Sequence, residues 1–407
     1  MTVPFENENE SLIVNAQERA LPGRPGYGAA GLTAVLPSVA ASVGVPRDER
    51  VPAGPPESAL LDLAPARRAV VVLVDGLGLR LLTRRSGHAP FLRSLLPTAR
   101  TLRCGFPSTT ATSMGSFGTG LPPGAHGLVG LEVLDPATDR VFSELSWENG
   151  PDPRRWQPER TVFERAVAAG VDVTIIGPGY FDGSGLMTAA LRGARFRAGV
   201  DLPHRVDQAL TALRNSERAG SAPGSLVYLY WGEVDKAGHV HGCESWQWGD
   251  ELEATDRELA RLATSLPRDT ALYVTADHGM VDVPFEWRLD LAAEADLAAG
   301  VRLVGGEPRS PQLYCVPGAA ADVAAAWRER LGERAWVFSR ELADAVGLFG
   351  AVAESVRPRL GDVIVALDAG LAVVDSRVQR PELLALLGLH GSLTADELDI
   401  PLLTYRA

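Results

Sequence analysis

The stretch VVVLVDGLG, residues 70–78, decides the fold. Its apolar run ends at Asp75, which Gly76 follows. Continuous apolar runs of this kind are typical of parallel strands that are buried on both faces. Similar runs recur with helical patterns between them, at residues 171–176, 226–231 and 271–275 for the strands and 161–169, 201–214 and 248–265 for the helices. This alternation predicts an α/β fold with a doubly wound, mostly parallel sheet sandwiched by helices.

The rest of the chain predicts an arm and a core. Residues 1–65 are rich in Pro and Gly and predict an extended N-terminal arm with one short helix near residues 32–43. The core is expected to comprise residues 66–286 plus 371–407. We expect the chain to re-enter this core through the apolar residues 371–375.

Residues 287–370 differ from the core and predict a smaller inserted α+β cap subdomain. They contain an amphipathic helical pattern at 319–331 and short strand patterns at 311–316 and 362–367, separated by many turns. The segment lies between two motifs with ligand-type side chains. We therefore expect it to cover the functional site.

Composition and charge exclude several functions. The 407 residues carry a net charge of -12, from 51 acidic and 39 basic residues, so no nucleic-acid-binding patch is expected. No run approaches the ~18 consecutive apolar residues of a membrane span, so no membrane partner is expected. Three cysteines cannot all pair, and the first residues lack the pattern of a secretory signal. These features predict a cytoplasmic location.

Asp and His side chains recur where the predicted strands end. Asp235 and His239 are four residues apart, so on a helix they face the same way, and Asp277 directly precedes His278 after a strand. Taken singly, Asp75 could cap a turn, and the Asp235 and His239 pair could lie on the surface. Taken together, these side chains make two sets of about three ligands, which suits two transition-metal ions. The six candidates are Asp75, Asp235, His239, Asp277, His278 and His390.

A hydroxyl-rich segment lies between the first two of these motifs. It reads GFPSTTATSMGSFGTGLPPGAHG, from Gly105 to Gly127. A Thr that opens a helix can present its oxygen beside backbone N–H groups that favour an anion. Thr109 or Thr110 could equally cap the first turn of that helix. The two interpretations are compatible.

The order of these motifs resembles that of the alkaline phosphatase superfamily, and more narrowly its nucleotide pyrophosphatase/type I phosphodiesterase branch. The shared features are a strand followed by Asp-Gly, then TGLPPGAHG, DKAGH, DHGM and a late HG, and they span most of the chain from Asp75 to His390. The resemblance implies an alkaline phosphatase-like α/β/α core with two zinc ions, or manganese in some bacterial relatives.

The resemblance also implies a role for each residue. Asp235, His239 and His390 match one metal site. Asp75, Asp277 and His278 match the second, which also holds the nucleophile. The family nucleophile lies nine residues before the Thr of T-G, here Thr119, and this count selects Thr110, which would also contact the metals. Thr109 is the competitor, and would otherwise serve as a helix cap.

The implied activity is cleavage of phosphodiester or nucleotide pyrophosphate bonds through a phospho-threonine intermediate, on a small, nucleotide-like substrate. The alternatives are a phosphomonoesterase or phosphonate hydrolase on the same site, and a non-catalytic metal-binding protein. One departure concerns the substrate. The family's phosphate-binding Asn, five residues after His126, is Leu131 here, and Trp147 and Asn149 are candidate substitutes.

Overall fold

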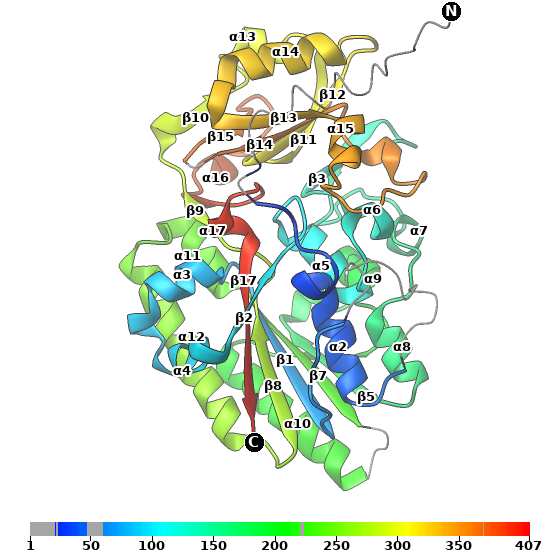
Figure 1. Ribbon diagram of the computed structural model, residues 1–407, viewed down its shortest axis with the longest axis vertical. Coiled ribbons are helices and arrows are strands. Elements are labelled where there is room, and N and C mark those ends of the chain that lie inside the picture. Colours follow the sequence, from blue (N-terminus) through cyan, green and yellow to red (C-terminus); the bar gives the residue numbers. More distant parts are fainter. Residues whose placement is uncertain (1–20, 22, 47–59, 220–223, 369) are drawn as a thin grey trace, which may run out of the picture.

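Two sheets organise the molecule, a larger one in the lower part of Figure 1 and a smaller one above it. The structure, a computed structural model, describes residues 21, 23–46, 60–219, 224–368 and 370–407. Pro22 and the Pro-rich residues 52–56 of the expected arm lie outside these ranges. The expected helix of the arm is present, as the 3-10 turn η2 (Leu32–Ala34) followed by α2 (Val35–Ser42).

The larger sheet has the strand order β2-β17-β8-β1-β7-β5-β6. Its strands are β1 (Arg68–Val74), β2 (Arg100–Arg103), β5 (Asp172–Gly177), β6 (Arg195–Ala198), β7 (Ser225–Trp231), β8 (Thr270–Thr275) and β17 (Asp399–Arg406). β1 pairs in parallel with β7 and β8, whereas β17 runs antiparallel to β8 and β2. β1, β7 and β8 are buried along their whole length, as expected for strands covered on both faces. The predicted, mostly parallel sheet is therefore confirmed.

Helices flank this sheet (Figure 1). α2 contacts β1 and α8 contacts β5, while α10 contacts β5, β7 and α12. The remaining bounds are α3 (Leu79–Arg84), α4 (Pro90–Leu95), α5 (Thr110–Thr119), α6 (Pro123–His126), α7 (Pro153–Trp156), α8 (Val162–Ala168), α9 (Gly185–Ala190), α10 (Leu202–Ala219), α11 (Glu233–His241), α12 (Trp246–Ser265) and α17 (Ala395–Leu398). α12 begins at Trp246 rather than at Trp248, because the side chain of Ser245 accepts a hydrogen bond from the Trp248 N–H and caps the helix there.

The smaller sheet and its helices form a second unit, which we call the cap. Its strand order is β13-β14-β12-β11-β3-β4, and the paired strands are antiparallel. Its elements are β3 (Glu132–Asp135), β4 (Arg140–Ser143), β11 (Val301–Glu307), β12 (Ser310–Cys315), β13 (Ala335–Ser339), β14 (Val363–Leu367), α13 (Ala295–Ala298), α14 (Ala320–Leu331) and α15 (Arg340–Ala345). Leu313, Trp327 and Val365 contribute to a separate apolar core. Because β3 and β4 precede residue 287, the cap sheet draws on more than the expected insertion.

The expected return of the chain to the main core at residues 371–375 is wrong. β15 (Ala372–Val374) pairs with β10 (Arg288–Asp290), and Leu371 and Val373 pack in the core of the cap. A short apolar run fits either sheet, so the sequence alone does not decide between them. After α16 (Pro381–Leu384), the chain reaches the site through β16 (Gly388–Leu389), which pairs with β9 (Val281–Asp282).

Candidate active site

The topology brings the six candidate ligands to one edge of the larger sheet. Asp75 directly follows β1, and the Asp277-His278 pair closely follows β8. Asp235 and His239 lie on α11, which begins just after β7. Because β1, β7 and β8 are parallel neighbours, their carboxyl ends meet at one edge, where ligands bind in sheets of this kind. His390 arrives there from β16.

Gly76 allows the loops after β1 and β7 to touch. Its φ is +70°, in the left-handed region that favours glycine. A Cβ at this position would lie 2.9 Å from both Cβ and Oδ1 of Asp235. The Gly76 N–H donates to Oδ1 of Asp277 over 3.2 Å. Gly76 therefore lets the three carboxylates approach one another.

The hydroxyl of Thr110 faces the cluster. Its Oγ1 lies 3.2 Å from Nε2 of His278 and 3.5 Å from each carboxylate oxygen of Asp75. Thr110 is the first residue of α5, where the helix N-terminus favours an anion.

The hydroxyl of Thr109 points elsewhere and donates to the carboxylate of Glu307 in β11. The expectation that the Thr109 side chain caps α5 is therefore wrong. Thr109 occupies the N-cap position, but its side chain makes no capping hydrogen bond, and its hydroxyl donates to Glu307 instead.

Two overlapping groups of side chains bring ligand atoms within 4.8 Å of one another. They are Asp235 with His278 and His390, and Asp75 with Asp277 and His278. The resemblance predicted His239, rather than His278, beside Asp235 and His390. Nε2 of His239 lies 3.3 Å from Oδ2 of Asp235, and its ring centroid lies 5.2 Å from that of His390. All six candidates thus lie in one cluster, and their division between two ions stays a prediction.

The three histidines of the cluster share one hydrogen-bond arrangement. Nδ1 of His239 lies 2.7 Å from the Gly388 carbonyl oxygen, Nδ1 of His278 lies 3.1 Å from that of Gly279, and Nδ1 of His390 lies 2.8 Å from that of Ser108. A carbonyl oxygen only accepts, so each Nδ1 carries a proton and donates it. In the neutral ring, Nε2 is then left as the free ligand atom. Histidines that bind metals are oriented in this way.

Two buried carboxylate oxygens in the cluster have no hydrogen-bond partner, namely Oδ1 of Asp235 and Oδ2 of Asp277. The other oxygen of Asp277 accepts from the N–H groups of Gly76 and His278. A buried carboxylate oxygen without a partner lowers the stability of the fold, because it has lost its hydrogen bonds to water. A cation in the cluster would bind these oxygens and remove that penalty. Carboxylate oxygens and imidazole nitrogens are also ligands that zinc takes. The residues present therefore fit a divalent-metal site.

Burial and neighbouring charges shift the pKa values in the cluster. Burial, together with the charges of Asp277 and Asp235, raises the pKa of Asp75 well above its ordinary value. Burial and the charge of Asp235 raise the pKa of Asp277 to about 7. Burial opposes the charged form of His239, but the carboxylate of Asp235 outweighs it and raises the pKa of His239 to about 9. Protons therefore occupy the cluster at neutral pH when no cation does.

The sequence analysis missed two residues beside the cluster. The Tyr230 hydroxyl donates to Oδ2 of Asp75 over 2.5 Å and orients that carboxylate. Its position, one residue before the end of β7, is the signal that could have found it. Glu307 of the cap is only 5% exposed and contacts Thr109. Burial, above all, raises the pKa of Glu307 to about 8. No sequence motif marks Glu307.

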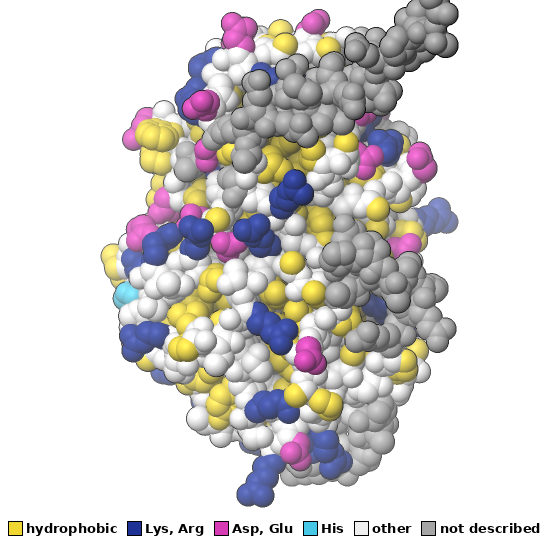
Figure 2. Space-filling model, viewed as in Figure 1, with side chains coloured by type: hydrophobic (Ala, Val, Ile, Leu, Met, Phe, Trp, Pro, Cys, Tyr) yellow, Lys and Arg dark blue, Asp and Glu magenta, His cyan; other side chains and the backbone are white. Residues whose placement is uncertain are grey.

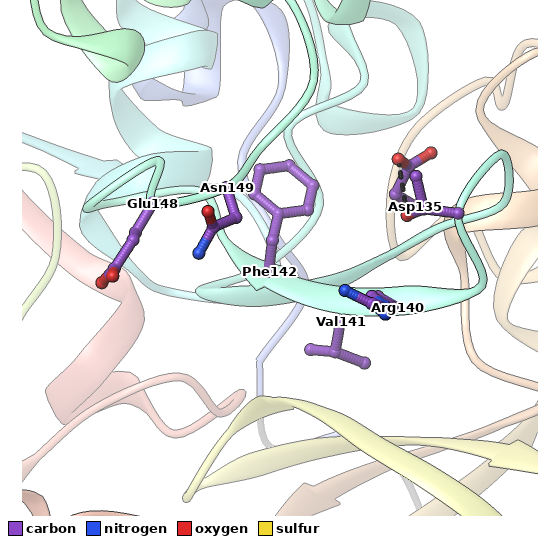
Figure 3. Close-up of a pocket in the computed structure, with 7 residues that line it drawn as sticks. Asp135, Arg140, Val141, Phe142, Glu148 and Asn149 are labelled. Carbon is purple, nitrogen blue, oxygen red and sulfur yellow. Dashed lines mark hydrogen bonds between the residues drawn. The ribbon is translucent and has the colours of Figure 1, made fainter.

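Neither candidate substitute for the Asn expected at Leu131 is placed with the ligands. The indole N–H of Trp147 donates a hydrogen bond to the carbonyl oxygen of Pro151 over 2.7 Å. Asn149 lines a cavity of about 540 Å³ beside the β3–β4 hairpin (Figure 3). Figure 3 shows Asp135 at the opposite end of this cavity from Glu148. None of the six candidate ligands lines it.

On the face that Figure 2 shows, basic and acidic side chains are interspersed. Among the described helices, none combines the length and apolar character that crossing a bilayer requires.

The mostly parallel sheet, the helices that flank it and the Asp and His cluster at one sheet edge define an α/β protein with a candidate metal site at the carboxyl ends of its strands. The chain belongs to the type I phosphodiesterase / nucleotide pyrophosphatase family, a branch of the alkaline phosphatase superfamily, and the family model matches residues 69–393. The predicted family is therefore confirmed, and it is a family of hydrolases.

Two mouse proteins resemble parts of the chain. Ectonucleotide pyrophosphatase/phosphodiesterase family member 7 is 41% identical over 64 residues, which are 14% of this chain and 15% of that protein. Bis(5'-adenosyl)-triphosphatase enpp4 is 27% identical over 193 residues, which are 43% of this chain and 39% of that protein. The matches thus span less than half the length of these relatives.

Solved structures resemble more of the chain. Murine ectonucleotide pyrophosphatase/phosphodiesterase 5 has a TM-score of 0.64 and 19% identity, and the match covers 83% of this chain and 87% of that one. Phosphonoacetate hydrolase from Sinorhizobium meliloti 1021 has a TM-score of 0.62 and 20% identity, and the match covers 84% and 90%. At these identities the likeness establishes the fold, which confirms the predicted alkaline phosphatase-like architecture.

Proposed function

We propose that the protein is a metal-dependent phosphohydrolase that cleaves phosphodiester or nucleotide pyrophosphate bonds through a phospho-threonine intermediate on Thr110. The observation that carries the proposal is the position of the Thr110 hydroxyl, which lies at the N-terminus of α5 and 3.2 Å from Nε2 of His278. Two divalent ions, zinc or else manganese, would be held by one set of three residues each. The sets are Asp235, His239 and His390, and Asp75, Asp277 and His278.

The residues of the chain have separate tasks in this reaction. When bound, the two ions would supply positive charge that lowers the pKa of the nucleophile and stabilises the phosphoryl and leaving oxygens. Oγ1 of Thr110 loses its proton to solvent and attacks phosphorus in line with the leaving oxygen, whose bond to phosphorus breaks as the new bond forms. The N–H groups at the start of α5 bind phosphoryl oxygens, and Tyr230 keeps Asp75 in place. Water then cleaves the phospho-threonine and restores Thr110.

An exposed aromatic ring at the same sheet edge supports a nucleotide-like substrate. Tyr180 is 79% exposed and lies on η6 (Gly179–Phe181), which follows β5. Phe181 contacts Tyr180 with ring centroids 5.1 Å apart and Tyr230 with centroids 5.0 Å apart. A nucleobase can stack on such a ring. A related murine structure holds AMP in an inactive variant, which supports the same substrate class.

A phosphonate hydrolase or phosphomonoesterase on the same site is the second candidate. It is favoured by the shared fold of phosphonoacetate hydrolase and by Leu131 at the position of the phosphate-binding Asn. The purified, zinc-loaded protein should be assayed with a bis-aryl phosphate diester, a dinucleoside polyphosphate, an aryl monophosphate and phosphonoacetate. We expect the highest kcat/KM for the first two substrates. The reverse order would favour the second candidate, and no turnover of any substrate would contradict both.

A cytoplasmic location remains a prediction. Cys104, Cys243 and Cys315 are all free, and this supports a reducing compartment.

A further inference from the structure

A buried ion pair joins the cap to the core next to the proposed metal site. Arg309 lies between β11 and β12, and Glu397 lies in α17. Both side chains are fully buried. Nε and Nη2 of Arg309 donate to the two carboxylate oxygens of Glu397, at 3.1 and 2.8 Å. This is the two-point geometry in which a guanidinium and a carboxylate fix each other's orientation.

Glu397 also holds both histidine loops that close the site. Its Oε1 accepts the N–H of Ser392 over 3.0 Å, two residues after His390. Its backbone carbonyl accepts the N–H of Gly279 over 2.8 Å, one residue after His278. A single residue therefore ties together two loops that the chain brings in from different strands.

Arg309 ties these loops to the cap. Its Nη1 donates to the carbonyl oxygen of Asp368 over 2.7 Å and also to that of Leu371, and its Nη2 donates to that of Leu367 over 3.2 Å. These carbonyls lie at the end of β14 and just before β15. The guanidinium therefore binds the ends of two cap strands at the point where the cap meets the core.

The hairpin of β11 and β12, which we call the cap hairpin, lies directly beside His390. A Cβ on Gly391 would lie 2.6 Å from Cβ of Glu307 in β11, so Gly391 packs directly against the Glu307 side chain. The N–H of Gly391 donates to Oγ of Ser108, and the carbonyl of Ser108 accepts the Nδ1 proton of His390. The contact of the cap hairpin with Gly391 is thus connected, through Ser108, to the orientation of the His390 ring.

We propose that Arg309 and Glu397 are positioning residues, whose ion pair holds the loops of His278 and His390 in the geometry that binds metal. A buried ion pair is in itself weak grounds for stability, because apolar residues of the same volume often serve as well. The Glu397 side chain bonds to the His390 loop and the Glu397 backbone carbonyl bonds to the His278 loop, so an ion pair that fixes Glu397 fixes both loops, which points to positioning instead. The proposal rests on the two-metal site of the proposed function.

The test is the zinc affinity of the full-length protein, measured by competition with a chelating dye. The variants are Arg309→Met and Glu397→Gln, together with a double Arg309→Met/Glu397→Met variant that leaves no unpaired buried charge. Loss of a residue that orients metal ligands typically weakens binding by 10- to 100-fold, and we expect about that loss in all three variants.

Arg192 provides a matched control. It pairs with Glu164 over 3.1 Å and donates to the carbonyls of Gln157 and Ala189, and none of these residues lies in a ligand loop. Arg192→Met should lower the melting temperature and leave zinc affinity unchanged. If the double variant folds and binds zinc as tightly as the wild-type protein, Arg309 and Glu397 only tie the cap down, and the proposal is overturned. If the wild-type protein itself binds no zinc, the two-metal site has failed first.

Discussion

Thr109 and Thr110 are adjacent, yet their hydroxyls face different parts of the molecule. Thr110 Oγ1 lies 3.2 Å from Nε2 of His278 in the core, whereas Thr109 Oγ1 donates to Glu307 of the cap. Thr109 is the extended N-cap residue, with φ of -141° and ψ of 152°, whereas Thr110 opens the helix, and only Thr110 faces the metal ligands. The nucleophile assignment therefore predicts opposite results for substitutions at the two positions.

Thr110→Ala should abolish turnover while the fold and metal binding remain. Without Oγ1, no phospho-threonine can form, and removal of a nucleophile costs at least about a thousandfold in kcat. Mass spectrometry of enzyme quenched during turnover should find phosphate on Thr110 in the wild-type protein. Phosphate mapped to Thr109 would reverse the assignment.

Thr109→Ala should keep most activity but lose stability. The buried carboxyl of Glu307 would lose its partner, which costs about 1–3 kcal/mol of unfolding free energy. Thr109→Ser retains the hydroxyl and should behave like the wild-type protein. Urea unfolding of the three proteins measures the difference. Loss of turnover in Thr109→Ala with normal stability would contradict this prediction.

Zinc affinity should rise with pH up to about 9. Burial and the charge of Asp235 raise the pKa of Asp277 to about 7. Burial opposes the charged form of His239, but the charge of Asp235 outweighs it and raises that pKa to about 9. At neutral pH, His239 and a part of Asp277 therefore hold protons that a metal must displace. The apparent affinity should therefore increase as pH rises through these values. Calorimetry in buffers of different ionisation enthalpy should detect the released protons at pH 7. Equal affinity at pH 6 and pH 9 would contradict the prediction.

The larger sheet and the ligand loops could be predicted from the sequence because their signals are local. The apolar run of β1 ends at Asp75, and the Asp277-His278 pair follows a second such run. Strands that run in parallel must then bring these side chains to one edge. The choice of Thr110 and the division of the ligands between two ions depended in addition on the resemblance to the family.

The contacts between cap and core could not be predicted in the same way. Thr109 and Glu307 are 198 residues apart, and Arg309 and Glu397 are 88 residues apart. Such pairs depend on how the cap hairpin sits on Gly391, which no local pattern encodes. Thr109 looked like a helix cap because Thr is favoured there, but its hydroxyl donates to Glu307 and accepts no N–H group of the first turn.

Gly76→Ala should disturb the metal site more than an ordinary glycine substitution does. The new Cβ would lie 2.9 Å from Asp235, so that carboxylate must move. Gly183 is the matched control, because its φ of +74° is similar but nothing lies within 4 Å of its Cβ position. Gly183→Ala should cost only the strain of a left-handed residue, about 1–2 kcal/mol, and should bind zinc normally. Equal zinc affinity in both variants would contradict the argument.

His126 should make the fold sensitive to acid. It is fully buried, its Nδ1 accepts the N–H of Leu128 over 3.1 Å, and its Nε2 lies 3.1 Å from Oγ of Ser116. Nε2 therefore carries the single ring proton and donates it. Burial, together with the charge of Arg359, lowers the pKa of His126 to about 3.

The folded protein therefore keeps His126 neutral at pH values where the unfolded chain, with a pKa of about 6.5, binds a proton. Stability from this residue is present above pH 6.5 and falls as pH drops toward 3, by up to about 1.4 kcal/mol per pH unit. His126→Asn keeps an acceptor for Leu128 but does not titrate. Urea unfolding of the metal-free proteins at pH 7 and pH 4.5 should show a smaller loss of stability in His126→Asn than in the wild-type protein. Equal losses would mean that other groups govern acid unfolding.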